Sequence, residues 1–149
     1  MEFNNPSLLI KDLNFGEDAK SKIGAGVEKL AKAVKSTLGA SGKCVIYEDA
    51  RGIPVITKDG VTVAESVVLY DPVENLGATL IKEAAKNTVR EAGDGTTTAT
   101  VLAESLLNTI NLPEYKDSAD RVLREGVKSG LAKINNYLDS VKIDVTDDK

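Results

Sequence analysis

The sequence predicts a mainly α protein with a β-hairpin inserted between its first two helices. Apolar residues recur at helical spacing in four long segments. One further segment, residues 43–57, places two β-rich runs on either side of a turn centred on Asp49-Ala50-Arg51-Gly52. The 149 residues are enough for one domain with its own core.

The first helix is predicted over residues 16–38, with Gly39 as the residue that ends it. Acidic residues in its first turn and lysines later in the segment suit the helix dipole. The apolar positions that predict its buried face are Ile23, Val27, Leu30, Ala31, Val34 and Leu38. In the hairpin that follows, Pro54 cannot donate to a strand ladder, which predicts an edge or bulged strand.

The second helix has the clearest start in the chain. Asp71 can cap it, Pro72 suits the first helical position, and Glu74 can reach back to the cap. This helix is expected to run to about Ala92. The residues expected on its buried face are Leu76, Leu80 and Ala84.

Two further helices are predicted, over residues 96–110 and from about Ser118 to Val141. The apolar residues expected to bury the earlier one are Val101, Leu102, Leu106 and Ile110. Those that define the face of the later one are Leu123, Val127, Leu131, Ile134, Leu138 and Val141. Residues 1–13 are predicted to form an extended arm, and the acidic tail to be solvated.

Composition excludes several classes of function. The net charge of −4 disfavours non-specific binding of nucleic acid. The absence of histidine excludes catalytic triads that use it. The single cysteine, Cys44, excludes an intrachain disulfide and is expected to be a small core residue. The chain has neither a membrane-spanning apolar run nor a signal peptide, so a cytoplasmic location is expected.

The stretch "GDGTTT" (93–98) separates two predicted helices and is the first candidate site. Glycines there leave backbone N–H groups uncovered at a helix start, where the dipole attracts anions. Asp94 would repel a bare phosphate but suits a Mg²⁺ ion that bridges to one. The alternative is an ordinary turn in which Asp94 caps the helix, and spacing alone gives the two about even weight.

Two other turns are weaker candidates by themselves. The loop "TLGASG" (37–42) ends in Gly42-Lys43, but a Walker A loop needs glycine in place of Thr37 and Ser or Thr in place of Cys44. A helix end followed by a turn is the simpler interpretation. In Lys58-Asp59-Gly60 a carboxylate could orient water beside a lysine, although a surface turn is the more common use of such a tripeptide.

Together these turns resemble one family. Four stretches match the group I chaperonins, which are bacterial and organellar ATP-driven folding machines, in order and spacing: "TLGASGK", "ITKDGVTVAE", "DPVENLGATLIKEAA" and "AGDGTTTATVLAE". The resemblance extends from about Lys11 to Val141. It implies that residues 1–141 are the first segment of the multihelical equatorial ATP-binding domain, with the hairpin as an intersubunit stem-loop and residues 142–149 leading toward an intermediate domain.

The resemblance also implies a site. It assigns Mg²⁺ to Asp94 and phosphate contacts to Gly95, Thr96, Thr97 and Thr98. It places along the nucleotide the loop residues Thr37, Leu38, Gly39 and Ala40. Lys58 would lie near the phosphates and, with the Thr37 region, near a K⁺ ion, while Asp59 would be the catalytic carboxylate that positions or activates water. The implied cofactors are ATP or ADP, Mg²⁺ and K⁺.

Some residues depart from the family pattern. Ala40 stands where the family usually has proline, so that loop could be looser, and Cys44 stands where it usually has asparagine. No counterpart of the second equatorial segment, which supplies a further catalytic aspartate, follows in the sequence. We therefore expect weak or absent ATP turnover by this chain alone, and exposed apolar faces that favour self-association.

The implied function is ATP-dependent assistance of protein folding within a ring of like subunits. Unfolded proteins and a co-chaperonin would bind only through domains beyond this segment, and neither nucleic acid nor membrane is an expected partner. The alternative is a short non-catalytic interaction module that assembles with a full-length ring or modulates it.

Overall fold

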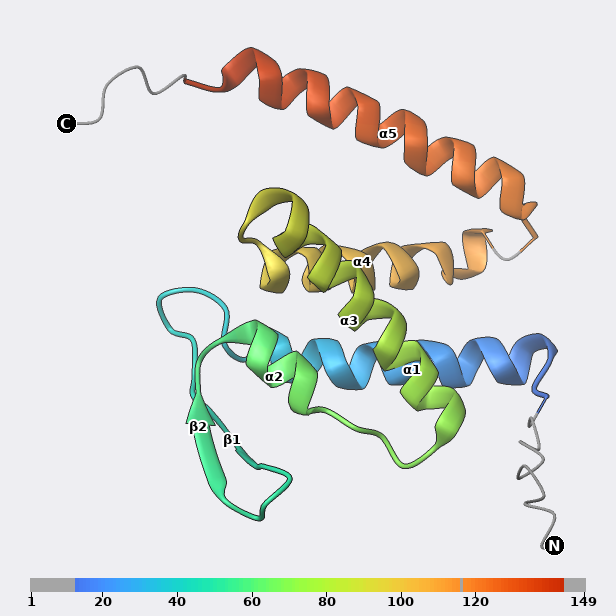
Figure 1. The fold of residues 1–149 in the computed structure, drawn as a ribbon. Helices are drawn as coiled ribbons and strands as arrows, with labels where there is room; N and C mark the ends of the chain where they lie inside the picture. The colour runs from blue at the N-terminus through green and yellow to red at the C-terminus, as the bar shows by residue number, and fades with distance from the viewer. Residues whose placement is uncertain (1–12, 116, 144–149) are drawn as a thin grey trace, which may run out of the picture. The chain divides into compact units, whose positions relative to one another are not determined.

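A computed structural model describes residues 13–115 and 117–143 (Figure 1). The elements in order are α1 (Gly16–Lys35), β1 (Val45–Glu48), β2 (Pro54–Thr57), α2 (Gly60–Ser66), α3 (Pro72–Ala92), α4 (Thr96–Ile110), the 3₁₀ turn η1 (Pro113–Tyr115) and α5 (Asp120–Val141). The mainly α class with one hairpin is confirmed. The chain divides into two units, Met1–Leu107 and Asn108–Lys149. No helix within the described ranges combines the length and apolarity needed to cross a membrane.

In the first unit, α1 and α3 pack directly against each other through glycines. A Cβ atom at Gly26 would lie 1.8 Å from the carbonyl oxygen of Glu74, and one at Gly77 would lie 2.2 Å from that of Ile23. No side chain fits at either position without moving the backbone of the other helix. The two helices can therefore approach this closely only because each has glycine at the contact.

This close contact decides which face of α3 is buried. The buried residues of α3 are Gly77, Ala78, Ile81 and Ala85. Ile81 is 6% exposed, whereas its neighbour Leu80 is 55% exposed. The predicted face of Leu76, Leu80 and Ala84 was therefore wrong: the buried face of α3 carries Gly77 where α1 lies too close for a side chain, and Ala78, Ile81 and Ala85 along the rest.

The core of the first unit lies between α1, α2 and α3. Its buried residues are Val27, Leu30, Val34, Val63, Ala64, Ala78 and Ile81. The predicted face of α1 is confirmed at Val27, Leu30, Ala31 and Val34. The helix ends at Lys35, before the predicted Gly39, because the N–H groups of Thr37 and Leu38 bond to the carbonyls three residues before them, those of Val34 and Lys35, at 3.1 Å. Leu38 consequently lies outside the helix and is exposed.

The short helix α2 was not predicted. Its first turn is capped by Asp59, described below. At its other end, the Lys82 Nζ of α3 donates to the carbonyl oxygen of Val67, the residue that follows the helix. Burial of this amine lowers the pKa of Lys82. A lysine that donates to the last carbonyls of a helix opposes the negative end of the dipole.

The hairpin forms within the predicted range. Strands β1 and β2 pair antiparallel, with Val45 opposite Thr57 and Glu48 opposite Pro54. Pro54 is the first residue of its strand, a position that tolerates the missing N–H group. Cys44 precedes β1 and is exposed, so the prediction of a core cysteine was wrong.

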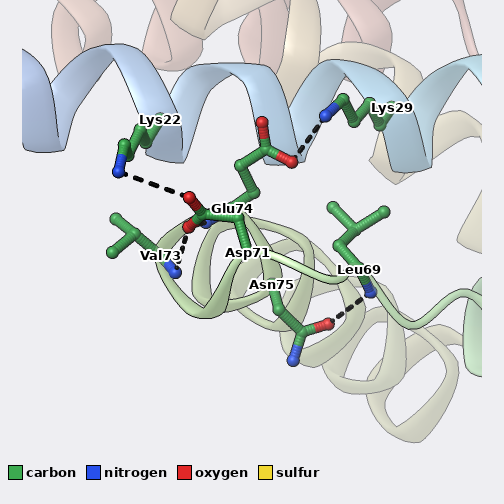
Figure 2. Close-up of polar contacts among 7 residues, drawn as sticks. All are labelled: Lys22, Lys29, Leu69, Asp71, Val73, Glu74 and Asn75. Carbon is green, nitrogen blue, oxygen red and sulfur yellow. Dashed lines mark hydrogen bonds and ion pairs between the residues drawn. The ribbon is translucent and has the colours of Figure 1, made fainter.

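Figure 2 shows how the start of α3 is held. Asp71 caps the helix as predicted: its Oδ1 accepts from the N–H groups of Val73 at 2.8 Å and Glu74 at 3.2 Å. These bonds lower the pKa of Asp71, with the Glu74 N–H as the larger cause. The Glu74 carboxylate does not close the predicted capping box. It accepts a hydrogen bond from the Lys29 Nζ of α1 at 2.5 Å, and this contact between the two helices replaces the capping box.

Helix α4 buries a polar face. Its buried residues are Thr96, Thr100 and Glu104, which recur at every fourth position. The Thr100 hydroxyl donates to the Thr96 carbonyl at 2.9 Å, and Glu104 forms an ion pair with Lys35 of α1. The prediction of a buried Leu102 and Leu106 was wrong, because both are exposed; Val101 and Ile110 are half-buried.

In the second unit, α5 begins at Asp120, two residues after the predicted start, and ends at Val141 as predicted. None of its residues is buried: Leu123 is half-buried, and the later part of its apolar stripe, Leu131, Ile134, Leu138 and Val141, is exposed. The predicted arm lies outside the described residues except for Leu13. Within this unit, a cleft of about 390 Å³ is lined by Thr109, Ile110, Tyr115, Ser118, Val122, Leu123, Gly126 and Val127.

Candidate functional site

The junction between α3 and α4 presents free backbone donors. Gly93 ends α3 in the left-handed conformation, with φ at +78°, and its N–H donates to the carbonyl of Val89 at 2.8 Å. Gly95 also has a positive φ, +92°. The first main-chain bond of α4 runs from the Ala99 N–H to the Gly95 carbonyl at 2.8 Å. The preceding N–H groups, of residues 96–98, thus belong to the first helical turn, which leaves its donors without helical partners.

The three threonines of that turn have different environments. Thr96 is buried, Thr97 is half-buried and Thr98 is exposed. The Thr96 side chain therefore belongs to the interior. The hydroxyls of Thr97 and Thr98 lie nearer the surface, where they could add side-chain donors.

Asp94 lies at the exposed entrance to this turn. Its Oδ1 accepts from the adjacent Gly95 N–H at 2.6 Å, which fixes the carboxylate beside the free donors. Within residues 13–115 and 117–143, no group of three or more acidic or cysteine side chains could hold a metal ion. A single carboxylate suits Mg²⁺ only when phosphate and water supply the other ligands. Asp94 could therefore hold a Mg²⁺ ion only if a bound phosphate supplies further ligands.

Asp59 caps α2. Its Oδ2 accepts from the Thr62 N–H at 3.0 Å and from the Thr62 hydroxyl at 2.5 Å, and its Oδ1 accepts from the Val61 N–H at 3.3 Å. The Thr62 hydroxyl is the largest cause that lowers the pKa of Asp59. A carboxylate with a lowered pKa is a poor proton acceptor at neutral pH. The remaining acceptor capacity of Asp59 suits it to orient a water molecule rather than to remove a proton.

Gly60 brings two of the predicted loops together. A Cβ atom at Gly60 would lie 2.2 Å from the Thr97 hydroxyl oxygen and 3.5 Å from a methyl carbon of Val34. The Lys58-Asp59-Gly60 turn therefore lies against the first turn of α4 and the last turn of α1. Lys58 itself is exposed beside this contact.

The third loop, residues 36–43, leaves the same end of α1 and closes on itself. The Lys43 N–H donates to the Ser36 carbonyl at 2.7 Å, and the Gly42 N–H donates to the Gly39 carbonyl at 3.0 Å. Gly39 has a φ of +76°, and the Thr37 hydroxyl donates to the Val34 carbonyl at 2.8 Å. The loop is thus a compact turn. Its outer residues, Leu38, Gly39 and Ala40, are exposed.

The Gly60 turn therefore lies between the end of α1, from which the loop of residues 36–43 departs, and the first turn of α4, to which residues 93–95 lead. Residues 30–149 match the family model described as the TCP-1/cpn60 chaperonin family. This chain belongs to the TCP-1/cpn60 chaperonin family. The predicted family resemblance is confirmed at this level.

A solved chaperonin shares the fold. The structure is similar, with a TM-score of 0.75 and 32% sequence identity, to the crystal structure of the chaperonin gp146 from the bacteriophage EL 2 (Pseudomonas aeruginosa) in the presence of ATP-BeFx. The match covers 87% of this chain and 22% of that chaperonin. This chain thus spans about a fifth of the length of the chaperonin that it matches.

Sequence reasoning missed several residues around the site. The sequence predicts Gly60 only as part of a turn, although it forms the contact between two loops. Thr62 follows Asp59 by three residues, and this capping spacing could have revealed α2. The pair of Lys35 and Glu104 has no local signal, because its members are 69 positions apart (104 − 35) and meet only in the folded chain.

Proposed function

We propose that this chain is the N-terminal part of the equatorial domain of an ATP-dependent chaperonin of the group I type, and that it binds Mg-ATP through its three loops. The parent would assist protein folding as a ring of like subunits in the cytoplasm. Membership of the chaperonin family supports the general function. The contact of Gly60 with Thr97 and Val34 is the observation that supports the site, because it brings the Lys58-Asp59-Gly60 turn against the first turn of α4 and the end of α1, from which the third loop departs.

The proposed binding mode follows from the donors. The free N–H groups of residues 96–98, at the positive end of α4, would hold the phosphate oxygens. Asp94 would hold a Mg²⁺ ion, which neutralises phosphate charge when bound. Lys58 would add a positive charge nearby, while the loop of residues 37–40 would cover the nucleotide. A K⁺ ion would bind near Lys58 and Thr37.

Hydrolysis in the parent would depend on the position of water. Asp59 is held by three hydrogen bonds and keeps its charge at neutral pH, so it can orient an attacking water in line with the terminal phosphate. The same bonds fix its direction. For this chain alone we expect binding with weak or absent turnover.

Nucleotide binding can be tested by calorimetry and thermal unfolding with MgADP. A ligand at 100-fold excess over its Kd stabilises the folded state by about 2.7 kcal/mol. The Asp94→Asn variant should lose the Mg²⁺-dependent part of this gain. Asp139→Asn, the same change on exposed α5, is the matched control and should keep it. Equal stabilisation of both variants, or none in the unchanged chain, would refute the proposed site.

The outward apolar stripe of α5 favours a second candidate, the non-catalytic module that joins a full-length ring. Mixing the labelled chain with intact chaperonin subunits and separating the species by size would test it. Elution of the label with the ring, without nucleotide binding by the chain, would favour this candidate.

A further inference from the structure

The buried carboxylate of Glu104 has a defined place relative to the candidate site. It lies on the same face of α4 as Thr96, eight residues and just over two helical turns away, or about 12 Å along the axis. Its side chain is only 7% exposed and forms an ion pair with Lys35. The Lys35 side chain is 42% exposed, so the amine reaches inward from the surface to meet it.

Lys35 connects this pair to a second part of the site. It is the last residue of α1, and the next residue, Ser36, accepts the hydrogen bond from Lys43 that closes the loop of residues 36–43. The neighbour on the other side, Val34, contacts Gly60. The pair therefore joins α4 to the residue from which the loop departs.

From this geometry we propose that Glu104 is a positioning residue for the nucleotide site, acting through its ion pair with Lys35. The inference rests on the proposed function. The pair sets the distance between the loop that would cover the nucleotide and the helix start that would hold its phosphates. Loss of the Lys35 amine would leave the Glu104 carboxylate, whose side chain is 7% exposed, without a compensating charge, so the pair favours the arrangement in which both groups meet.

The first measurement does not depend on nucleotide. Cys44 is the only cysteine, is exposed, and lies two residues after the loop's Gly42, so it can carry a spin label. A second label on Leu102→Cys, an exposed position on α4, reports the distance from loop to helix. Double electron–electron resonance should give a narrow distance distribution in the otherwise unchanged chain. Glu104→Gln should broaden it.

The matched control is another ion pair of α1. Glu74→Gln removes the partner of Lys29 and so breaks a contact between α1 and α3 that lies away from the loops. This variant should keep the narrow distribution. If both variants broaden it equally, the effect is general loosening of α1 and the proposal fails.

The second measurement is MgADP affinity by calorimetry in the chain with its native cysteine. Displacing supporting residues typically weakens a site, and we expect Glu104→Gln to raise Kd on the order of tenfold. Glu74→Gln should leave Kd unchanged. Lys35→Met should match Glu104→Gln, the double variant should be no worse than either, and Lys35→Arg should retain affinity. Additive losses in the double variant would show that Glu104 does not act through Lys35.

The two proposals fail in different ways. If the unchanged chain binds no MgADP, the proposed function is refuted, while the distance measurement still decides whether the pair positions the loop. If the chain binds MgADP and Glu104→Gln changes neither the distances nor Kd, the proposed function stands and the positioning role is refuted.

Discussion

The Cα of Gly26 on α1 faces the carbonyl of Glu74 on α3 so closely that a Cβ atom would lie 1.8 Å from that oxygen. The same two helices are joined a short distance away by the pairs Lys29–Glu74 and Lys22–Asp71 (Figure 2). The two helices thus approach through residues without side chains, and ion pairs between them flank this contact.

Gly26→Ala should destabilise the first unit. The added methyl group must push α3 away, and overpacking of this kind costs about 1–3 kcal/mol. Gly24→Ala is the matched control, since nothing lies within 4 Å of its added Cβ and alanine favours a helix by about 1 kcal/mol. Urea unfolding followed by circular dichroism should show opposite shifts. Equal shifts would contradict the close contact.

Neighbouring residues on α3 should respond differently to truncation. Ile81→Ala removes a buried side chain and should cost about 2–5 kcal/mol. Leu80→Ala removes an exposed one, and its cost should stay within about 0.5 kcal/mol. The same unfolding assay compares them. A larger loss of unfolding free energy for Leu80→Ala than for Ile81→Ala would show that the face predicted from the sequence is the buried one.

Gly60→Ala should move Thr97. The new Cβ would lie 2.2 Å from the Thr97 hydroxyl, which must shift along with the first turn of α4. We expect weaker MgADP binding and a lower melting temperature. The double variant Gly60→Ala/Thr97→Ala should relieve the clash and recover the melting temperature. Its MgADP affinity should stay below that of the unchanged chain, because the Thr97 hydroxyl is lost. Full tolerance of Gly60→Ala would show that the two loops are not in contact.

Stability should depend on the charge of Asp59. Its pKa is lowered on folding, so its contribution is present above the ordinary aspartate value of 3.8 and is lost as the pH falls through the lowered value. Asp59→Ala removes the cap and should cost about 1 kcal/mol at pH 7. Unfolding curves at pH 7 and pH 3 should therefore differ less for this variant than for the unchanged chain. If stability changes equally between pH 7 and pH 3 in both proteins, the acid sensitivity comes from groups other than Asp59.

The apolar stripe of α5 should make the chain self-associate. Leu131, Ile134 and Leu138 are exposed on one side of this helix, and apolar patches of this kind favour association. Ile134→Lys should lower the weight-average molar mass measured by sedimentation equilibrium, without loss of helical content. Lys133→Ala, at the adjacent position, is the control. A monomeric unchanged chain at tens of micromolar would contradict the prediction.

Local rules predicted the helices and their caps well. Asp71-Pro72 marks the start of α3, and the span of α4 matches its predicted range, because capping and periodicity are properties of the segment itself. The inward faces of α3 and α4 could not be read in the same way. Periodicity identifies several apolar stripes, but the partner helix decides which one is buried. Here the buried faces carry Gly77, Ala78, Ile81 and Ala85 on α3, and Thr96, Thr100 and Glu104 on α4.

The site shows the same division. The three loops were recognised from their residues, and Gly39, Gly93 and Gly95 do have the positive φ angles that such turns need. The contact between Gly60 and Thr97, and the pair of Lys35 and Glu104, join residues that are distant in sequence. No local pattern encodes them, so only the folded chain reveals which residues support the loops.

The support of α2 by Lys82 implies an order of folding. A helix of seven residues is too short to persist by itself in water, because helix nucleation is costly and few bonds follow it. Its carbonyl end receives a donor only after α3 has docked and delivered that lysine. We therefore expect α2 to form late, which means that the carboxylate of Asp59 acquires its direction as one of the last events of folding.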